Sequence, residues 1–262
     1  MPVPKWFAGV AVAAALIMLT PAIATAGTPP PTSQAGSIPG WALVGPLFHE
    51  GLDHHHSCTA SVLDSPGHDL IITAAHCVSG TGAGIEFAPG YDHGATPYGV
   101  WTSTAAYVDP SWIRSQDTQH DYAILRLARQ RVHGHLAGVA DVTRVSEAIA
   151  PAPRRGQRLT VPAYPAGIDD EPIDCAVTAY YTAGYPSFDC GGYVGGTSGS
   201  PWLKRVGRHW LVTGVIGGLH QGGCVDYTSY SSAFGPDTYR LWLRAALGRP
   251  ADTVPAAGSD GC

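Results

Sequence analysis

The chain has 262 residues, with 33 glycines, 22 prolines and a formal net charge of −5 at pH 7. This glycine and proline content is high for a helical protein and suits many short strands joined by tight turns. The mild net charge gives no reason to expect nucleic acid or a membrane surface as a partner. We therefore expect a β-rich protein with one large domain or two small ones.

The first 26 residues predict an export signal. Lys5 supplies a positive charge, Val10 to Leu19 form an apolar run, and Ala24-Thr25-Ala26 is a small-residue cleavage site. The alternative is a membrane anchor, but this run is shorter than the ~20 apolar residues that a membrane span needs. We expect removal of residues 1–26, which leaves a secreted, extracellular protein without membrane contact.

The segments that follow predict short strands. Residues 27–40 are rich in Pro, Gly, Ser and Thr and are expected to form a flexible leader or short propeptide. Cys58 to Leu63 and Asp69 to Thr73 are predicted to be strands joined by a turn over residues 64–68. Tyr122 to Leu127 alternates and predicts a further strand, which places Asp121 at its start.

The second half repeats this pattern after a proline-rich linker, which is expected over residues 146–157. Trp202-Leu203 and Trp210 to Ile216 are predicted to pair around a turn at Val206-Gly207-Arg208. Near the end the apolar spacing changes to that of a helix over residues 236–248. Its apolar face is expected to comprise Tyr239, Trp242, Leu243, Ala246 and Leu247, with Asp237 as its cap. Residues 249–262 are assigned to a tail.

Six cysteines in an exported chain indicate three disulfides, although six allow fifteen pairings. Local spacing favours Cys58 with Cys77 and Cys175 with Cys190, since each pair brackets one hairpin. Cys224 and Cys262 remain, either as a third pair or as thiols that are free or bonded to another chain. Zinc is excluded because no Cys-x-x-Cys or close Cys/His quartet exists. The histidine run His54-His55-His56 is interpreted as a solvated loop.

Three separate segments together predict nucleophilic catalysis. They are Thr73-Ala74-Ala75-His76-Cys77, His120-Asp121-Tyr122-Ala123-Ile124-Leu125 and Gly195-Gly196-Thr197-Ser198-Gly199-Ser200-Pro201. A serine hydroxyl is a poor nucleophile until an imidazole accepts its proton and a carboxylate holds that imidazole in the right tautomer. The chain order His, Asp, Ser excludes the α/β-hydrolases, which use Ser, Asp or Glu, His.

These segments, with Gly214-Val215-Ile216-Gly217-Gly218 and the final helix, resemble the chymotrypsin/trypsin-like serine endopeptidases, and more closely their bacterial, glutamyl-endopeptidase-like branch. The resemblance covers about Val44 to Leu247. It implies an all-β fold of two antiparallel six-stranded β-barrels with the active site between them and a C-terminal α-helix. The barrels are expected over residues 41–145 and 158–235.

The resemblance also implies the roles of individual residues. Ser198 matches the nucleophile, His76 the general base and Asp121 the orienting carboxylate. The amides of Gly196 and Ser198 match the oxyanion hole. No metal or organic cofactor is implied. The implied partner is a protein or peptide substrate bound in an extended conformation by a monomeric enzyme.

The substrate pocket departs from well-known patterns in the family. A trypsin-like preference would place a carboxylate where this chain has Gly192, and glutamate-specific relatives place a histidine for which His220 is the nearby candidate. Glycines at 217 and 218 leave backbone groups free for an extended peptide. Gly192, Gly217, Gly218 and His220 are therefore the predicted substrate-binding residues. Thr197 stands where many animal relatives carry the aspartate that pairs with a new amino terminus, so maturation must work differently.

Two other functions are compatible with the same fold. One is a catalytically silent binding or adhesion protein, which the intact set His76, Asp121, Ser198 and Gly196 argues against. The other is an esterase, which a comparison of peptide and ester substrates would distinguish. We expect a secreted serine endopeptidase.

Overall fold

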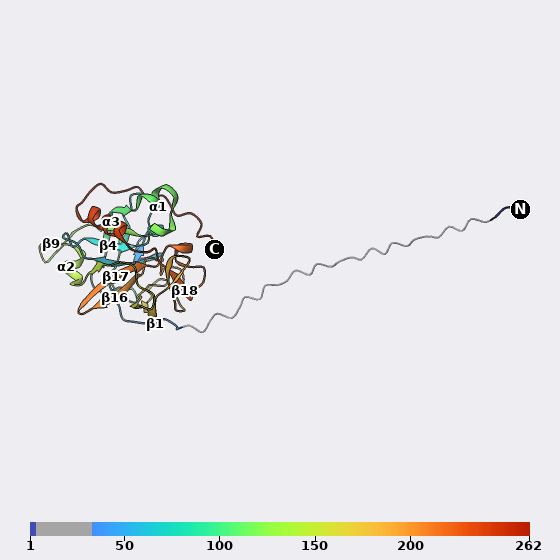
Figure 1. Cartoon of the computed structure of the whole chain (residues 1–262). Coiled ribbons are helices and arrows are strands. Elements are labelled where there is room, and N and C mark those ends of the chain that lie inside the picture. Colours follow the sequence, from blue (N-terminus) through green and yellow to red (C-terminus); the bar gives the residue numbers. More distant parts are fainter. Residues whose placement is uncertain (4–32) are drawn as a thin grey trace. The chain divides into compact units, whose positions relative to one another are not determined.

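The computed structural model describes residues 1–3 and 33–262. The chain separates into two units, Met1–Pro30 and Pro31–Cys262. All strands and helices of the described residues lie in the second unit (Figure 1). The predicted export signal falls on residues that are, apart from the first three, outside the described part. Within that part no helix has the length and apolar character needed to cross a bilayer.

The first half forms a closed antiparallel barrel of six strands. Its hydrogen-bonded order is β3-β2-β5-β6-β7-β4, and β4 pairs back with β3. The strands are rich in Val, Ile, Leu and aromatic residues, whose side chains fill the barrel. They are β2 (Val44–Phe48), β3 (Cys58–Leu63), β4 (Leu70–Thr73), β5 (Glu86–Phe87), β6 (Trp101–Val108) and β7 (Ala123–Leu127).

The second half surrounds a core of its own, in which Phe188 packs edge-on against Trp202 with ring centroids 4.9 Å apart. Four of its strands pair in the order β13-β11-β16-β17, and three more pair as β14-β15-β18. Those of the first set are β11 (Arg158–Thr160), β13 (Ala176–Thr178), β16 (Pro201–Val206) and β17 (His209–Val215). The second set comprises β14 (Tyr180–Thr182), β15 (Tyr185–Asp189) and β18 (Thr228–Tyr230).

The expected linker over residues 146–157 contains a strand that joins the two halves. β10 (Glu147–Ile149) runs parallel to β17 and also meets β3 at Leu63. It is the parallel member of an otherwise antiparallel sheet and connects the first barrel to the set β13-β11-β16-β17 of the second half. The two halves are therefore joined by backbone hydrogen bonds through β10.

Glu147 of β10 is fully buried and lies within the join between the halves. Ser61 Oγ donates a hydrogen bond of 2.5 Å to Glu147 Oε1, while Oε2 has no partner among the described residues. Burial raises the pKa of Glu147 from 4.5 to about 8, and the bond from Ser61 opposes that shift. The folded protein therefore holds this carboxyl protonated at neutral pH.

Replacing Glu147 with glutamine is expected to reduce the fall in the free energy of unfolding between pH 4.5 and about 8. Between pH 4.5 and about 8 the unfolded chain has lost this proton and the folded chain keeps it. The free energy of unfolding therefore falls as pH rises, on the order of 1 kcal/mol per pH unit. Urea unfolding at pH 5 and pH 8 measures this. Glu147→Gln should match the wild type at pH 5 and exceed it at pH 8, and equal slopes would refute the assignment.

The two halves also contain shorter strands, helices and turns. β1 (Gly36–Ser37) pairs with β12 (Ile173–Asp174), and Ala35 N donates to Gly191 O. Part of the expected flexible leader is thus an added strand of the second half, because its backbone finds partners there. The remaining short elements are β8 (Gln130–Val132), β9 (His135–Ala137), α1 (Pro110–Ser115), α2 (Val139–Thr143) and the 3₁₀ turns η1 (Ala75–Cys77), η2 (Thr118–His120) and η3 (Leu219–Gly222).

Helix α3 (Pro236–Ala246) confirms the predicted C-terminal helix but not its details. Its N-cap is Gly235, whose amide donates to Thr238 Oγ1, so the prediction that Asp237 caps it is wrong. The predicted apolar face is confirmed only in part, since Trp242 and Ala246 are partly buried and pack against the core. The buried residues of the helix are Thr238, Leu241 and Ala245, whereas Tyr239, Leu243 and Leu247 are exposed.

The physical reason is the close approach of α3 to the first barrel. Arg126 of β7 donates to the carbonyl of Ala245, and Arg244 donates to the carbonyl of Val108 at the end of β6. The small side chains of Thr238 and Ala245 permit that approach.

All six cysteines are paired. The disulfides are Cys58–Cys77, Cys175–Cys190 and Cys224–Cys262. The first disulfide joins β3 to η1, the turn that carries His76. The third joins Cys224, which lies two residues after η3, to the segment after α3. Two of the three bonds therefore lie beside the candidate active site.

Candidate active site

His76 and Asp121 meet because of strand pairing in the first barrel. β4 and β7 are antiparallel, with Thr73 opposite Ala123. His76 follows the end of β4 and Asp121 precedes the start of β7, so both lie at the same edge of the sheet. His76 Nδ1 and Asp121 Oδ2 are 2.8 Å apart. A direct hydrogen bond thus joins two residues that are 45 positions apart in the sequence.

The Asp121 carboxylate is fully buried and held from three sides. Besides the imidazole, the amide of His76 donates to Oδ1 at 2.9 Å and the amide of Gly218 donates to Oδ2 at 2.8 Å. The amide of Asp121 itself donates to Ser232 Oγ at 2.9 Å. Because a carboxylate only accepts, Nδ1 carries the proton of the neutral imidazole and Nε2 is free to accept one.

The Ser198 loop is fixed between the two halves. The amide of Thr59 donates to Ser198 O at 2.7 Å, and Thr59 Oγ1 donates to Gly196 O at 3.0 Å. Gly196 and Gly199 have φ angles of +92° and +83°. A Cβ at Gly199 would lie 2.1 Å from Thr73 Oγ1, so only glycine fits there. The glycines of the motif therefore permit a tight turn against β3.

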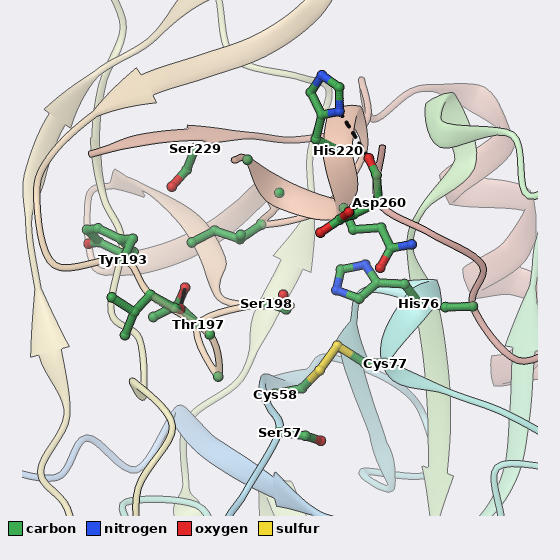
Figure 2. A pocket seen from close by; sticks show the side chains of 18 of the residues that line it. Ser57, Cys58, His76, Cys77, Tyr193, Thr197, Ser198, His220, Ser229 and Asp260 are labelled. Atoms are coloured by element: carbon green, nitrogen blue, oxygen red, sulfur yellow. Dashed lines mark hydrogen bonds between the residues drawn. A yellow bond between two sulfur atoms is a disulfide. The ribbon is translucent and has the colours of Figure 1, made fainter. Parts of the chain in front are cut away.

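Ser198 and His76 line the same cavity of about 650 Å³. Figure 2 shows both residues at its centre, with Ser198 beside the imidazole of His76. The amides of Gly196 and Ser198 donate to no acceptor within residues 33–262. Two unpaired donors next to a serine and an oriented histidine are the groups that acyl transfer requires.

The predicted substrate-binding residues divide into two groups. His220 lines the cavity, whereas Gly192, Gly217 and Gly218 are not among its lining residues. A Cβ at Gly217 would meet Asp121 at 2.9 Å, and the amide of Gly218 holds the same carboxylate. Gly218 thus has a positioning contact with Asp121 that the sequence did not suggest.

Gly192 faces the added N-terminal strand and not the cavity. With φ at +99°, a Cβ there would lie 3.5 Å from Ala35. The nearby acid Asp189 is also absent from the residues that line the cavity. It accepts hydrogen bonds of 2.7 Å from the hydroxyls of Tyr180 and Thr228. Neither position therefore supplies charge to the pocket.

The cavity walls combine apolar and acidic groups. Tyr193, Val194, Ile216 and Val225 supply apolar surface, and Asp226 and Asp260 supply carboxylates. Lys and Arg are absent from its lining in the described part of the chain. Ala256, Ala257 and Asp260 belong to the tail, which sequence reasoning did not place at the site. The candidate pair Cys224–Cys262 was the signal that could have placed it there.

One expectation about the histidine run is wrong. His54 and His55 are exposed, as expected for a solvated loop, but His56 is buried. Its Nε2 lies 2.8 Å from Asp170 Oδ2, and its ring lies edge-on to Phe48. The carboxylate of the second half provides the partner that allows this imidazole to be buried in the barrel.

Two groups of three potential metal ligands occur in the described residues. One is Cys58, His76 and Cys77, and the other is His220, Cys224 and Cys262. In each group both cysteines are joined in a disulfide. Neither group therefore offers a thiolate ligand.

A curated relative has 32% identity to this chain over 76 residues, and is named an extracellular metalloprotease of Bacillus subtilis (strain 168). The match covers 28% of this chain and 23% of the relative, so the chain spans about a quarter of that protein's length. The metalloprotease name belongs to the relative alone.

Solved structures share the fold over most of the chain. Protease Anisep from Arthrobacter nicotinovorans has a TM-score of 0.68 at 25% identity, with 80% of this chain and 98% of that chain covered. A Glu endopeptidase solved in complex with MPD has a TM-score of 0.61 at 15% identity, with 82% and 97% covered. The family model described as trypsin-like peptidase domain matches residues 58–215. The chain belongs to the trypsin-like peptidase family.

Proposed function

We propose that this protein is a serine peptidase that hydrolyses peptide bonds through an acyl-enzyme on Ser198. The observation that carries the proposal is the hydrogen bond of 2.8 Å between His76 and the buried Asp121, with His76 lining the cavity that Ser198 also lines. A neutral imidazole in this tautomer can accept a proton from a serine hydroxyl. The family membership of residues 58–215 supports the same chemistry.

In the proposed reaction Ser198 Oγ attacks the carbonyl carbon of the peptide bond, and His76 Nε2 takes the hydroxyl proton. The buried Asp121 carboxylate stabilises the imidazolium that forms. The carbonyl oxygen becomes an oxyanion, for which the unpaired amides of Gly196 and Ser198 are the proposed donors. His76 then gives its proton to the leaving amine.

Water completes the cycle. His76 takes a proton from the water molecule as its oxygen attacks the acyl carbon, and the bond to Ser198 Oγ breaks. The proton returns to Oγ, so the free acid and the original enzyme are released. Each half of the cycle uses the same imidazole, first as base and then as acid.

We also propose that the protein acts outside the cell. Its three disulfides suit an oxidising compartment, and the first 26 residues have the composition of an export signal. Endopeptidase action is the subclass that the family resemblance implies.

A fluorophosphonate probe tests the proposal. It should label the purified protein at Ser198, because the probe phosphonylates a serine only when that serine is activated. His76→Ala should slow labelling at least about 10³-fold. Tryptic mapping identifies the labelled residue. A folded protein that is not labelled would instead support the catalytically silent binding protein.

A further inference from the structure

The segment after α3 follows a fixed course over the first barrel. The amide of Asp252 donates to Ala106 O at 2.9 Å, and Asp252 Oδ2 accepts from the amide of Val108 at 2.9 Å. Val254 is buried, and it exchanges two backbone hydrogen bonds with Gly80, of 2.7 and 2.8 Å. The chain is therefore anchored as it approaches the site.

Two glutamine side chains then hold the backbone of residues 256–258. Gln116, the left-handed residue that ends α1, donates from Nε2 to Ala256 O at 2.7 Å. Its Oε1 accepts from the amide of Gly258 at 2.7 Å. From η3, Gln221 Nε2 donates to Gly258 O at 2.8 Å. The segment thus bridges α1 and η3, which belong to different halves.

His220 and a disulfide fasten the end of this segment. His220 Nδ1 lies 3.0 Å from Asp260 O, and Cys262 is bonded to Cys224. His220 and Gln221 have φ angles of +52° and +50°, which are uncommon for residues other than glycine. This backbone conformation turns both side chains toward residues 258–260. In the structure the imidazole of His220 thus contacts the protein's own C-terminal segment.

The fastened segment is one wall of the cavity that holds Ser198. Ala256, Ala257 and Asp260 line it together with His76. Figure 2 shows Asp260 and His220 on one side of Ser198, opposite the disulfide Cys58–Cys77. The wall is acidic, since Asp260 is on it and neither Lys nor Arg lines the cavity within the described residues.

A peptide bound beside Gly217 can extend toward this wall. The carbonyl oxygen of Gly217 accepts no hydrogen bond from the described residues, and Gly217 immediately follows Ile216 of the cavity wall. An extended peptide can pair with the segment that follows β17 by donating to that oxygen. Continuing along the chain, this segment leads to His220 and Gln221, which hold residues 258–260. A peptide that follows it therefore meets the fastened segment within a few residues.

We propose that residues 256–260 form a fixed acidic end wall of the peptide cleft, so that the protein cleaves best after short segments with a free amino terminus. The ammonium of such a segment would lie beside the Asp260 carboxylate. This inference rests on the proposed serine-peptidase function and narrows its substrates. Bonds near an amino terminus are preferred over bonds in the middle of a chain.

Four matched substrates test the wall. All four have the same residue before the cleaved bond, and that residue is chosen from the bonds that the protein cleaves in a mixture of short peptides. The substrates carry either two or six residues before the cleaved bond. Each length is made with a free and with an acetylated amino terminus. The wild type should cleave the short free substrate with kcat/KM about tenfold or more above the other three.

One variant removes the wall, and a second variant removes only the charge of Asp260. A chain that ends at Pro255 and carries Cys224→Ser keeps the anchors Asp252 and Val254 but lacks the wall. It should cleave the six-residue substrates as well as the short ones. Asp260→Asn should keep the length preference and lose the preference for a free amino terminus. If the shortened chain does not fold, Cys224→Ser with Cys262→Ser releases the wall and should raise cleavage of the six-residue substrates.

The outcomes distinguish the inference from the proposed function. Cleavage of all four substrates at equal rates by the wild type would overturn the wall, and so would a length preference unchanged by its removal. Equal rates for the free and acetylated short substrates would overturn the contact with Asp260. If no variant cleaves any substrate and the fluorophosphonate does not label Ser198, the proposed function itself fails.

Discussion

Ser198→Ala is expected to lower kcat about 10⁴- to 10⁶-fold while leaving the fold intact. The variant removes the atom that would form the acyl bond in the proposed reaction, whereas the backbone contacts of the loop remain. Ser198 O still accepts from the amide of Thr59, and the turn still depends on Gly196 and Gly199. Hydrolysis of a short peptide by the purified variants, followed by mass spectrometry, measures the loss.

Ser200→Ala is the matched control for this variant. Ser200 lies on the same loop and is fully buried, but its Oγ has no partner among the described residues. Its removal should therefore leave kcat within about an order of magnitude of the wild type. A Ser200→Ala variant as inactive as Ser198→Ala would show that the loop, and not the Ser198 hydroxyl, is what the reaction needs.

Asp121→Asn is expected to lower kcat about 10⁴-fold with little change in KM. The carboxylate accepts from His76 Nδ1, from the amide of His76 and from the amide of Gly218. An asparagine has one acceptor oxygen and one NH₂ group. The amide of His76 donates to Oδ1 and that of Gly218 donates to Oδ2, so the NH₂ group replaces the acceptor of one of them. In either orientation the negative charge that stabilises the imidazolium is lost. With the NH₂ group at the Oδ2 position, it faces Nδ1 and forces the imidazole proton onto Nε2. Nε2 then cannot accept the proton of Ser198.

The neighbouring Asp117→Asn is the control. Asp117 accepts from the amide of Gln119 at 3.0 Å and lies 3.1 Å from His120 Nδ1, so it caps a turn away from the imidazole of His76. Its substitution should change kcat by less than about threefold. The pH profile gives a second readout, since a purely structural effect of Asp121→Asn would lower the rate equally at every pH.

The parts of the fold that the sequence predicted best are those set by local pattern. β3 spans Cys58–Leu63 as predicted, and β4 and β7 begin one residue later than predicted. Alternating or continuous apolar residues between turn signals determine such strands. The segments around His76 and Asp121 could be placed at one edge of the sheet for the same reason.

What the sequence did not predict depends on contacts between distant segments. His56 is buried because Asp170 of the other half pairs with it. The buried face of α3 follows the close approach of the barrel and not the size of its apolar side chains. The wall at residues 256–260 is held by amide side chains bonded to backbone, which leaves no periodic signal in the sequence.

The chemistry of Ser198 is tested most directly by trapping its acyl form. The protein is mixed rapidly with a p-nitrophenyl ester, the released nitrophenol is followed, and the quenched protein is digested and mapped. We expect a burst of nitrophenol stoichiometric with the enzyme and an acyl group on the peptide that contains Ser198, both absent from Ser198→Ala. An active protein that shows neither a burst nor an acyl group on Ser198 would contradict the proposed mechanism.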